Sequence, residues 1–321
     1  MNILDIIINS LSTGGTYAMI ALGYTMVYGI AKMLNFAHGD IIMVGAYTML
    51  VCINRIPYTT KLGNMVADML VKQCGLEEKV AANITVIAFG IISLIIAVIV
   101  CMLLGMIVEK LAYKPLRGAS PLAVLITAIG VSYLLQSAAQ IIFGPNQQNV
   151  PVGDFGKSKL FGVEISNYLI ITLVVSVVVM VGLTLFIKLT RTGRAMVAVS
   201  EDKGAAQLMG INVNAIITLT FAIGSALAAL AAYFTLIKNV GITNNMGAMP
   251  GIKAFTAAVI GGIGSVPGAM VGGILLGVIE TVATKIPVIA PYKDAISFLV
   301  LVIILLVKPS GLLGKKRREK V

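Results

Sequence analysis

The chain has 321 residues, of which 58% are hydrophobic and 12% are charged, and its mean hydropathy is +0.99. Soluble domains are roughly 45–50% apolar and about 25% charged, so this composition excludes a soluble globular protein and indicates an integral membrane protein. The net charge of +11 does not predict a nucleic-acid partner, because basic residues at the ends of apolar spans follow from the positive-inside rule. The three cysteines have no paired spacing and there is one histidine, so neither a disulfide framework nor a catalytic metal is expected.

The first part of the chain contains one long and one short apolar run. Ile6–Ala31 has no charged residue over 26 positions, more than the roughly 20 that cross a hydrocarbon core, and a break is expected at Gly14-Gly15 if anywhere. The motif Asn35–Asp40 (NFAHGD) precedes a charge-free run of only 13 residues, Ile41–Ile53, a length typical of a re-entrant or partly buried helix. Residues 54–79 mix four basic and three acidic residues, which predicts an external loop or insertion.

Further apolar runs predict spans, and the basic residues between them indicate the sides of the membrane. Segments 109–118, 188–203 and 308–320 hold 13 basic residues, against six in 144–164, 238–253 and 285–293. The positive-inside rule therefore places the first three segments in the cytoplasm. The Gly-, Pro- and amide-rich residues 144–164 predict a turn-forming external loop. The spans are expected at Val80–Val108, Pro121–Phe143, Ile165–Ile187, Ala215–Ile237 and Ala295–Val307.

The run Ala254–Glu280 is interrupted by a cluster of glycines and a proline. Because its two flanking segments are both predicted outside, this run should enter and return as two short helices hinged at the cluster. Irregular backbone at membrane depth persists only beside a water-filled pathway or against tightly packed protein. The alternative for the earlier polar motif is that His38 and Asp40 simply cap a helix starting at Ile41. The predicted translocation pathway comprises Asn35, His38, Asp40, Gly261, Gly262, Gly264, Ser265, Pro267 and Gly268.

The segment Thr190–Asn214 is the longest polar interruption after the first loop, and we call it the coupling stretch. Ser200 is predicted to cap a helix over Glu201–Met209, with acidic residues in its first turn, and Gly210 to end it in a left-handed conformation. Two interpretations stay open from these residues alone. The helix is either a lever moved by a partner protein or an amphipathic connector on the membrane surface.

Several chemical signatures are missing from the sequence. Neither a phosphate-binding GxxxxGK[ST] motif nor a GxSxG motif occurs, which argues against ATP binding by this chain and against an enzyme. A proton-coupled carrier would need ionisable groups near the centres of spans, where they are costly and usually functional. The ionisable residues closest to the apolar runs lie near span ends instead: His38, Asp40, Lys253, Glu280 and Asp294.

Five colinear blocks carry a resemblance that covers nearly the whole chain. They include ALGYTMVYGIAKMLNFAHGDIIMVGAY and GIKAFTAAVIGGIGSVPGAMVGG. The chain resembles the permease subunit of branched-chain amino acid ABC importers. The blocks are Ala21–Tyr47, Glu109–Gln136, Arg191–Asn214, Gly251–Gly273 and Tyr292–Gly314.

The resemblance implies an all-α, polytopic protein of the bacterial cytoplasmic membrane. We expect one permease domain, 1–321, with about eight to ten transmembrane helices including short or broken ones. Its implied partners are the lipid bilayer, a second related permease, two cytoplasmic ATPase subunits and an extracytoplasmic amino-acid-binding protein. The chain itself would bind no cofactor and would use ATP through its partners. Residues 308–321 would form a cytoplasmic basic tail.

In this family a cytoplasmic loop docks on the ATPase, and here that loop would be 188–214. Other ABC importers carry an EAA-x3-G pattern at this place, which Glu201, Ala205, Ala206 and Gly210 match loosely. Leucine, isoleucine and valine are the first choice of substrate, and urea or short amides the second. Two alternative functions belong to other classes of protein: a secondary carrier that works alone and a membrane enzyme. The coupling residues are predicted to be Arg191, Arg194, Glu201, Asp202, Ala205, Leu208, Met209 and Gly210.

Overall fold

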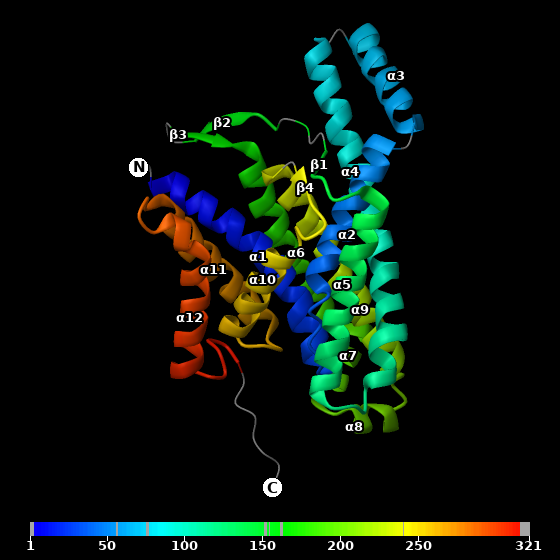
Figure 1. Cartoon of the computed structure of the whole chain (residues 1–321), viewed down its shortest axis with the longest axis vertical. Coiled ribbons are helices and arrows are strands. Elements are labelled where there is room, and N and C mark those ends of the chain that lie inside the picture. Colours follow the sequence, from blue (N-terminus) through cyan, green and yellow to red (C-terminus); the bar gives the residue numbers. More distant parts are fainter. Residues whose placement is uncertain are drawn as a thin grey trace.

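The structure is a computed structural model that describes residues 3–55, 57–74, 77–150, 153, 155–160, 163–239 and 241–314. The chain is almost entirely helical (Figure 1). The helices that belong to candidate membrane spans are α1 (Ile3–Ala31), α4 (Glu78–Val108), α5 (Pro121–Phe143), α6 (Asn167–Leu189), α9 (Val213–Lys238), α11 (Val266–Lys285) and α12 (Lys293–Val307). The other α-helices of the described residues are α2 (His38–Leu50), α3 (Pro57–Cys74), α7 (Arg191–Glu201), α8 (Lys203–Leu208) and α10 (Ala248–Gly261). Single turns are η1 (Val51–Arg55), η2 (Glu109–Tyr113), η3 (Lys114–Leu116) and η4 (Ala290–Tyr292).

Within the described residues, seven helical segments are long and apolar enough to cross a membrane. Two shorter apolar helical segments, His38–Asn54 and Ala248–Gly261, accompany them. The total, seven plus two, lies inside the expected range of eight to ten. The prediction of an all-α polytopic protein is therefore confirmed.

In the described part of the chain, four short strands accompany the helices. The strand β1 (Gln148–Asn149) pairs antiparallel with β4 (Gly241–Ile242), and β2 (Lys157–Leu160) pairs antiparallel with β3 (Val163–Ser166). All four lie at the same end of the molecule as α3 (Figure 1). The region predicted as a loop over residues 144–164 thus carries short strand pairs in its described part.

The helix α1 runs through the middle of the structure and packs against α11, α9, α6 and α10. Its contact with α11 depends on glycine, since a Cβ atom added at Gly14 would lie 2.7 Å from the Ile274 Cα atom. Small residues let helix backbones approach closely where burial in lipid gives no hydrophobic driving force. The expected break at Gly14-Gly15 was wrong, because α1 is continuous and these glycines are packing positions.

The short helix α2 begins at His38 rather than at Ile41. Its residues are largely buried, and it packs against α9, α4 and α10. His38 and Asp40 therefore lie inside the first helical turn rather than in front of the helix. The prediction of a short, buried helix is confirmed, whereas its predicted starting residue was three positions late.

The region 54–79 is helical over Pro57–Cys74, where a loop or insertion was predicted. The helix α3 packs on α4, and the two form a hairpin that projects from the rest of the molecule (Figure 1). The sequence contains the helical signal, because Leu62, Met65, Val66, Met69 and Leu70 recur at helical spacing. The prediction of a loop relied on the number of charged residues and did not consider this helical spacing of apolar residues. The predicted loop conformation was therefore wrong.

The helices α10 and α11 are joined by a four-residue turn, as the glycine cluster predicts. Gly262 and Gly264 have φ angles of 105° and 93°, a region that residues with a side chain rarely adopt. The helix α11 spans 20 residues, so the expectation of two short helices was wrong for this one. The backbone of residues 312–313 donates hydrogen bonds to the carbonyls of Ile260 and Gly261, at 2.8 and 2.9 Å. Of the predicted tail, residues 315–321 lie outside the described part.

Candidate functional site at the coupling stretch

The coupling stretch folds as two helices rather than one. The hydroxyl of Thr190 caps α7 by accepting a hydrogen bond from the Gly193 N–H at 2.9 Å. The carboxylate of Asp202 caps α8 by accepting from the N–H groups of Gly204 and Ala205, at 2.9 and 3.0 Å. The predicted cap at Ser200 was wrong, because this hydroxyl donates to the Val197 carbonyl inside α7.

The end of α8 follows the prediction. Gly210 has a φ angle of 82°, and its N–H donates to the carbonyl of Gln207 at 3.0 Å. The N–H of Ile211 donates to the carbonyl of Ala206 at 3.0 Å, which completes a Schellman motif. The left-handed stop at Gly210 is therefore confirmed, and it fixes the direction in which the chain enters α9.

The apolar side chains of α8 are turned outward. Leu208 is 91% exposed and Met209 is 82% exposed, and Ala205 is exposed beside them, whereas Ala206 is buried. Large apolar residues that stand together on a surface mark interaction sites. The charged residues predicted for coupling are exposed as well: Arg191, Arg194, Glu201 and Asp202.

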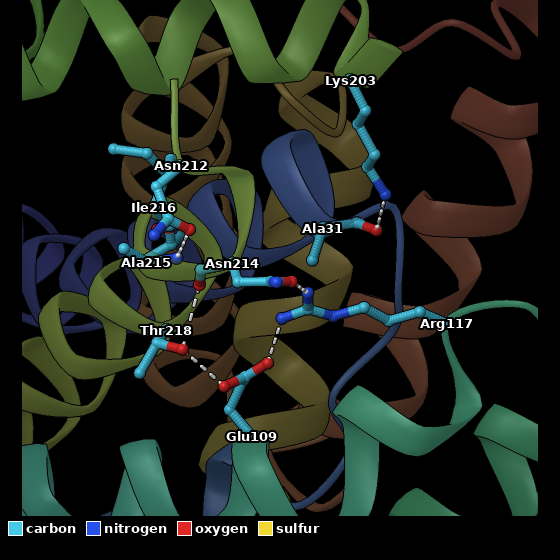
Figure 2. Close-up of polar contacts among 10 residues, drawn as sticks. Ala31, Glu109, Arg117, Lys203, Asn212, Asn214, Ala215, Ile216 and Thr218 are labelled. Atoms are coloured by element: carbon cyan, nitrogen blue, oxygen red, sulfur yellow. Dashed lines mark hydrogen bonds and ion pairs between the residues drawn. The ribbon is translucent and has the colours of Figure 1, made fainter. Parts of the chain in front are cut away.

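Lys203 joins α8 to the core of the protein. Its ammonium group donates a hydrogen bond to the carbonyl of Ala31, the last residue of α1, at 2.9 Å (Figure 2). A cation at this place neutralises the partial negative charge of a helix C-terminus and satisfies one of its free carbonyls. Burial lowers the pKa of the Lys203 ammonium group, and the positive charge of Arg117 lowers it further.

A second polar network ties the start of α9 to the end of α4. Glu109 is completely buried and accepts a hydrogen bond from the hydroxyl of Thr218 at 2.6 Å. Arg117 forms an ion pair with Glu109 and also donates to the side-chain carbonyl of Asn214 (Figure 2). The side chain of Asn212 caps α9 by accepting from the Ala215 N–H at 3.1 Å. The sequence did not single out Glu109, although a carboxylate next to an apolar span is a general signal for a partner.

The structure brings Asn35 and the glycine hinge to one small pocket between α1 and α10. The Oδ1 atom of Asn35 accepts a hydrogen bond from the Tyr113 hydroxyl at 2.8 Å. Its buried Nδ2 atom has no hydrogen-bond partner among the described residues. Gly29 of α1 packs against Gly264 of the hinge. The pocket is lined by Tyr24, Tyr28, Met33, Leu34, Asn35, Phe255, Ala258 and Ile263.

The other predicted pathway residues of the first motif do not line this pocket. His38 is buried, with its ring 4.7 Å from the ring of Tyr24 in an edge-to-face arrangement. Asp40 is also buried and accepts a hydrogen bond from the Gln136 amide at 2.8 Å, so its carboxylate is directed to α5. The motif Asn35–Asp40 is therefore divided between two sides of α2.

The remaining hinge residues pack against protein. Gly261 and Gly268 are in backbone contact with each other, and Gly262 packs against residues 310–314. Ser265 caps α11 by accepting from the Gly268 N–H at 3.2 Å, and Pro267 occupies the first turn of that helix. Their part in a pathway stays a prediction.

An ionic cluster joins residues that the sequence treated separately. The Lys253 ammonium group lies 2.9 Å from Glu280 Oε1 and 2.6 Å from Asp294 Oδ1. Tyr17 donates its hydroxyl proton to Glu280 Oε2 at 2.6 Å, and Lys293 lies 3.7 Å from Oε1 of the same carboxylate. These residues come from four helices, with Lys293 and Asp294 both at the start of α12, so only the folded chain reveals that they meet.

These features define a class of protein: an almost entirely helical, polytopic membrane protein with the coupling stretch on its surface. The chain matches the family described as "Branched-chain amino acid transport system / permease component" over residues 6–305. It is 43% identical over 320 residues to the "High-affinity branched-chain amino acid transport system permease protein BraD" of Pseudomonas aeruginosa, with 98% of this chain and 97% of that protein covered. It is 40% identical over 319 residues to the permease protein LivH of Salmonella typhimurium, with 98% and 96% covered. A solved structure, "PsaBC from Streptococcus pneumoniae in complex with Fab", is similar at a TM-score of 0.43 and 14% identity, covering 94% of this chain and 91% of that chain.

The chain therefore belongs to the family of branched-chain amino acid transport system permease components. It is a multi-pass membrane permease subunit of a bacterial ABC importer, which confirms the family and class predicted from the five sequence blocks. In this family the ATPase activity lies in partner subunits, so the permease is not an enzyme. Membership decides against the stand-alone secondary carrier and the membrane enzyme.

Proposed function

We propose that this chain imports leucine, isoleucine and valine as one of two related permease subunits. Two cytoplasmic ATPase subunits and an extracytoplasmic amino-acid-binding protein would complete the complex. The family match and the names of the relatives support this substrate class. The two ends of the molecule support the predicted sides, because α8 and α3 lie at opposite ends (Figure 1).

The coupling stretch is proposed to dock on an ATPase subunit. The observation that carries this proposal is the exposed apolar pair Leu208 and Met209 at the end of a doubly capped helix. Moving a two-state permease from 1:99 to 99:1 requires about 5.5 kcal/mol of differential binding. Burial of the exposed Leu208, Met209 and Ala205 contributes apolar free energy, and the exposed charges of Arg191, Arg194, Glu201 and Asp202 orient the contact.

Substitution of Leu208→Asp tests the docking surface. We expect the ATPase subunits to be lost when the complex is purified, and uptake to fall at least tenfold, because a charge replaces an apolar contact. Gln207→Asp is the matched control, since it places the same charge at the neighbouring exposed position of the same helix. Equal retention of the ATPase by both variants and the native chain would refute docking through this surface.

The substrate class needs a separate test. Uptake of labelled leucine by cells that carry the complete importer should be competed by isoleucine and valine, and not by urea or acetamide. Competition by urea or acetamide alone would replace the amino-acid assignment with the second choice.

The translocation pathway is proposed to pass Asn35 and the hinge between α10 and α11. The support is that Asn35 and Ile263 line one pocket and that the Asn35 amide group has no partner among the described residues. A single cysteine at position 263 should react with a small thiol reagent at a rate that changes when the importer turns over. A rate that is the same with and without ATP and substrate would count against this route.

A further inference from the structure

The turn η2 occupies a special place between the coupling stretch and the pocket. It is a π-helical turn that continues α4, and such turns are rare and frequently lie at functional sites. Its first and last residues, Glu109 and Tyr113, are both buried. Each of them makes a polar contact with a different part of the protein.

At one end of η2, Glu109 is connected to the coupling stretch. Arg117 bridges its carboxylate to Asn214, the last residue of that stretch. Thr218, one turn further along α9, donates to the same carboxylate at 2.6 Å. A displacement of the coupling stretch that moves the start of α9 therefore acts directly on η2 (Figure 2).

At the other end of η2, Tyr113 is connected to the pocket. Its hydroxyl donates to Asn35 Oδ1 at 2.8 Å, and its ring packs against Phe221 of α9 with 5.2 Å between the ring centroids. This hydrogen bond holds the Asn35 amide, so that the plane of the group and the direction of its Nδ2 atom at the pocket are fixed. Tyr113 is only 1% exposed, so a docked partner cannot touch its side chain directly.

The coupling stretch reaches the same connecting segment by a second, direct contact. Lys203 of α8 donates to the carbonyl of Ala31, and Asn35 lies four residues further along the chain. The segment between α1 and α2 is thus held at two points, at Ala31 by Lys203 and at Asn35 by Tyr113. Lys203 belongs to the coupling stretch, and Tyr113 is connected to that stretch through η2. Between these two contacts, Lys32 has a φ angle of 61°, which is unusual for a residue with a side chain.

We infer that η2 and Lys203 form a two-armed relay that passes the movement of the coupling stretch to Asn35 at the pocket. Tyr113 and Lys203 are positioning residues, because they act through the segment that carries Asn35. The inference rests on the proposed function and specifies which side chains transmit the ATPase's action. It requires that removing one arm separates ATP hydrolysis from uptake, without loss of the ATPase subunits from the complex.

The substitution Tyr113→Phe tests the first arm in the complete importer, since it removes one hydroxyl and keeps the ring. We expect about a five- to tenfold lower number of substrate molecules taken up per ATP hydrolysed, the factor that corresponds to one buried hydrogen bond. ATPase subunits should co-purify normally. Tyr133→Phe is the matched control, because that tyrosine is exposed on α5. An unchanged uptake-to-ATP ratio, or a fall that only follows a lower thermal midpoint, would overturn the relay.

The double variant Tyr113→Phe with Lys203→Met tests whether the two arms converge. If both act on the segment that carries Asn35, the fall in the uptake-to-ATP ratio should exceed the product of the two single effects. If the fall in the double variant equals the product of the two single effects, the two arms act independently and do not converge on the segment that carries Asn35. Leu208→Asp separates the relay from the proposed docking. If that variant loses the ATPase subunits while Tyr113→Phe keeps the native uptake-to-ATP ratio, the relay alone is refuted; if Leu208→Asp retains the ATPase subunits, docking through α8 is refuted.

Discussion

Two ionic networks among the described residues differ in what they connect. The network of Glu109 and Arg117 lies beside the coupling stretch and includes Asn214, an exposed side chain. The cluster of Lys253 and Glu280 has its partners on α1 and at the start of α12, so it joins four helices to one another. One network lies near Ala31 of α1 and the other near Tyr17 of the same helix. At the rise of an α-helix, these two residues are roughly 21 Å apart.

The difference indicates two separate mechanical roles. The Lys253 cluster balances its charges among helices that are packed together, which favours a fixed arrangement. In the Glu109 network Asn214 is an exposed residue of the coupling stretch itself, so its contact with Arg117 can be exchanged when a partner binds to that stretch. We therefore expect the first cluster to govern stability and the second to govern coupling.

The largest expected effect is that of Lys253→Met. This substitution leaves Glu280 and Asp294 without the ammonium group between them, and breaking a buried ion pair in this way costs about 3–5 kcal/mol. The thermal midpoint of the purified importer measures the loss. Lys159→Met serves as the control, since the pair of Lys159 and Glu164 is exposed and contributes about 0–1 kcal/mol.

A smaller loss of stability is expected for Glu109→Gln. The amide keeps an oxygen that accepts from Thr218, and Arg117 retains Asn214, so we expect about 1–3 kcal/mol. Uptake per ATP should nevertheless fall more than it does in Lys253→Met molecules that remain folded. The comparison fails if Glu109→Gln lowers the thermal midpoint as much as Lys253→Met and leaves the uptake-to-ATP ratio unchanged.

The smallest expected effect is local and concerns Asp202→Ala. Removal of a helix N-cap costs about 1 kcal/mol, which corresponds to roughly fivefold faster amide exchange in α8 without a change in the global thermal midpoint. Hydrogen exchange over residues 203–209 measures it. Asp202→Asn, which keeps a capping oxygen, should exchange at the native rate; if it exchanges as fast as Asp202→Ala, the carboxylate has a role beyond capping.

Local signals in the sequence were sufficient for much of the fold. The span Pro121–Phe143 has the predicted bounds, and Gly210 ends α8 in the predicted conformation, because hydrophobic length and glycine chemistry act within a few residues. The cap was assigned to Ser200 rather than Asp202 because both residues satisfy the same short-range rule, and only the helix geometry decides which oxygen faces free N–H groups.

The sequence could not predict which residues far apart in the chain lie close together in the structure. Lys253 and Glu280 are 27 residues apart, and Tyr113 and Asn35 are 78 residues apart. No period or motif relates such positions, since their contact depends on how the helices pack. For the same reason the sequence predicts a break at Gly14, whereas its lack of a side chain makes room for α11, a helix far along the chain.

The contact of residues 312–313 with the end of α10 has a consequence for how the protein is made. These N–H groups satisfy the carbonyls of Ile260 and Gly261, yet the ribosome adds them about fifty residues later. Until they arrive, the end of α10 keeps two free acceptors, which are costly where water is excluded. The hinge is thus completed only by nearly full-length chains, and a chain truncated before residue 312 leaves these two carbonyls without their partners.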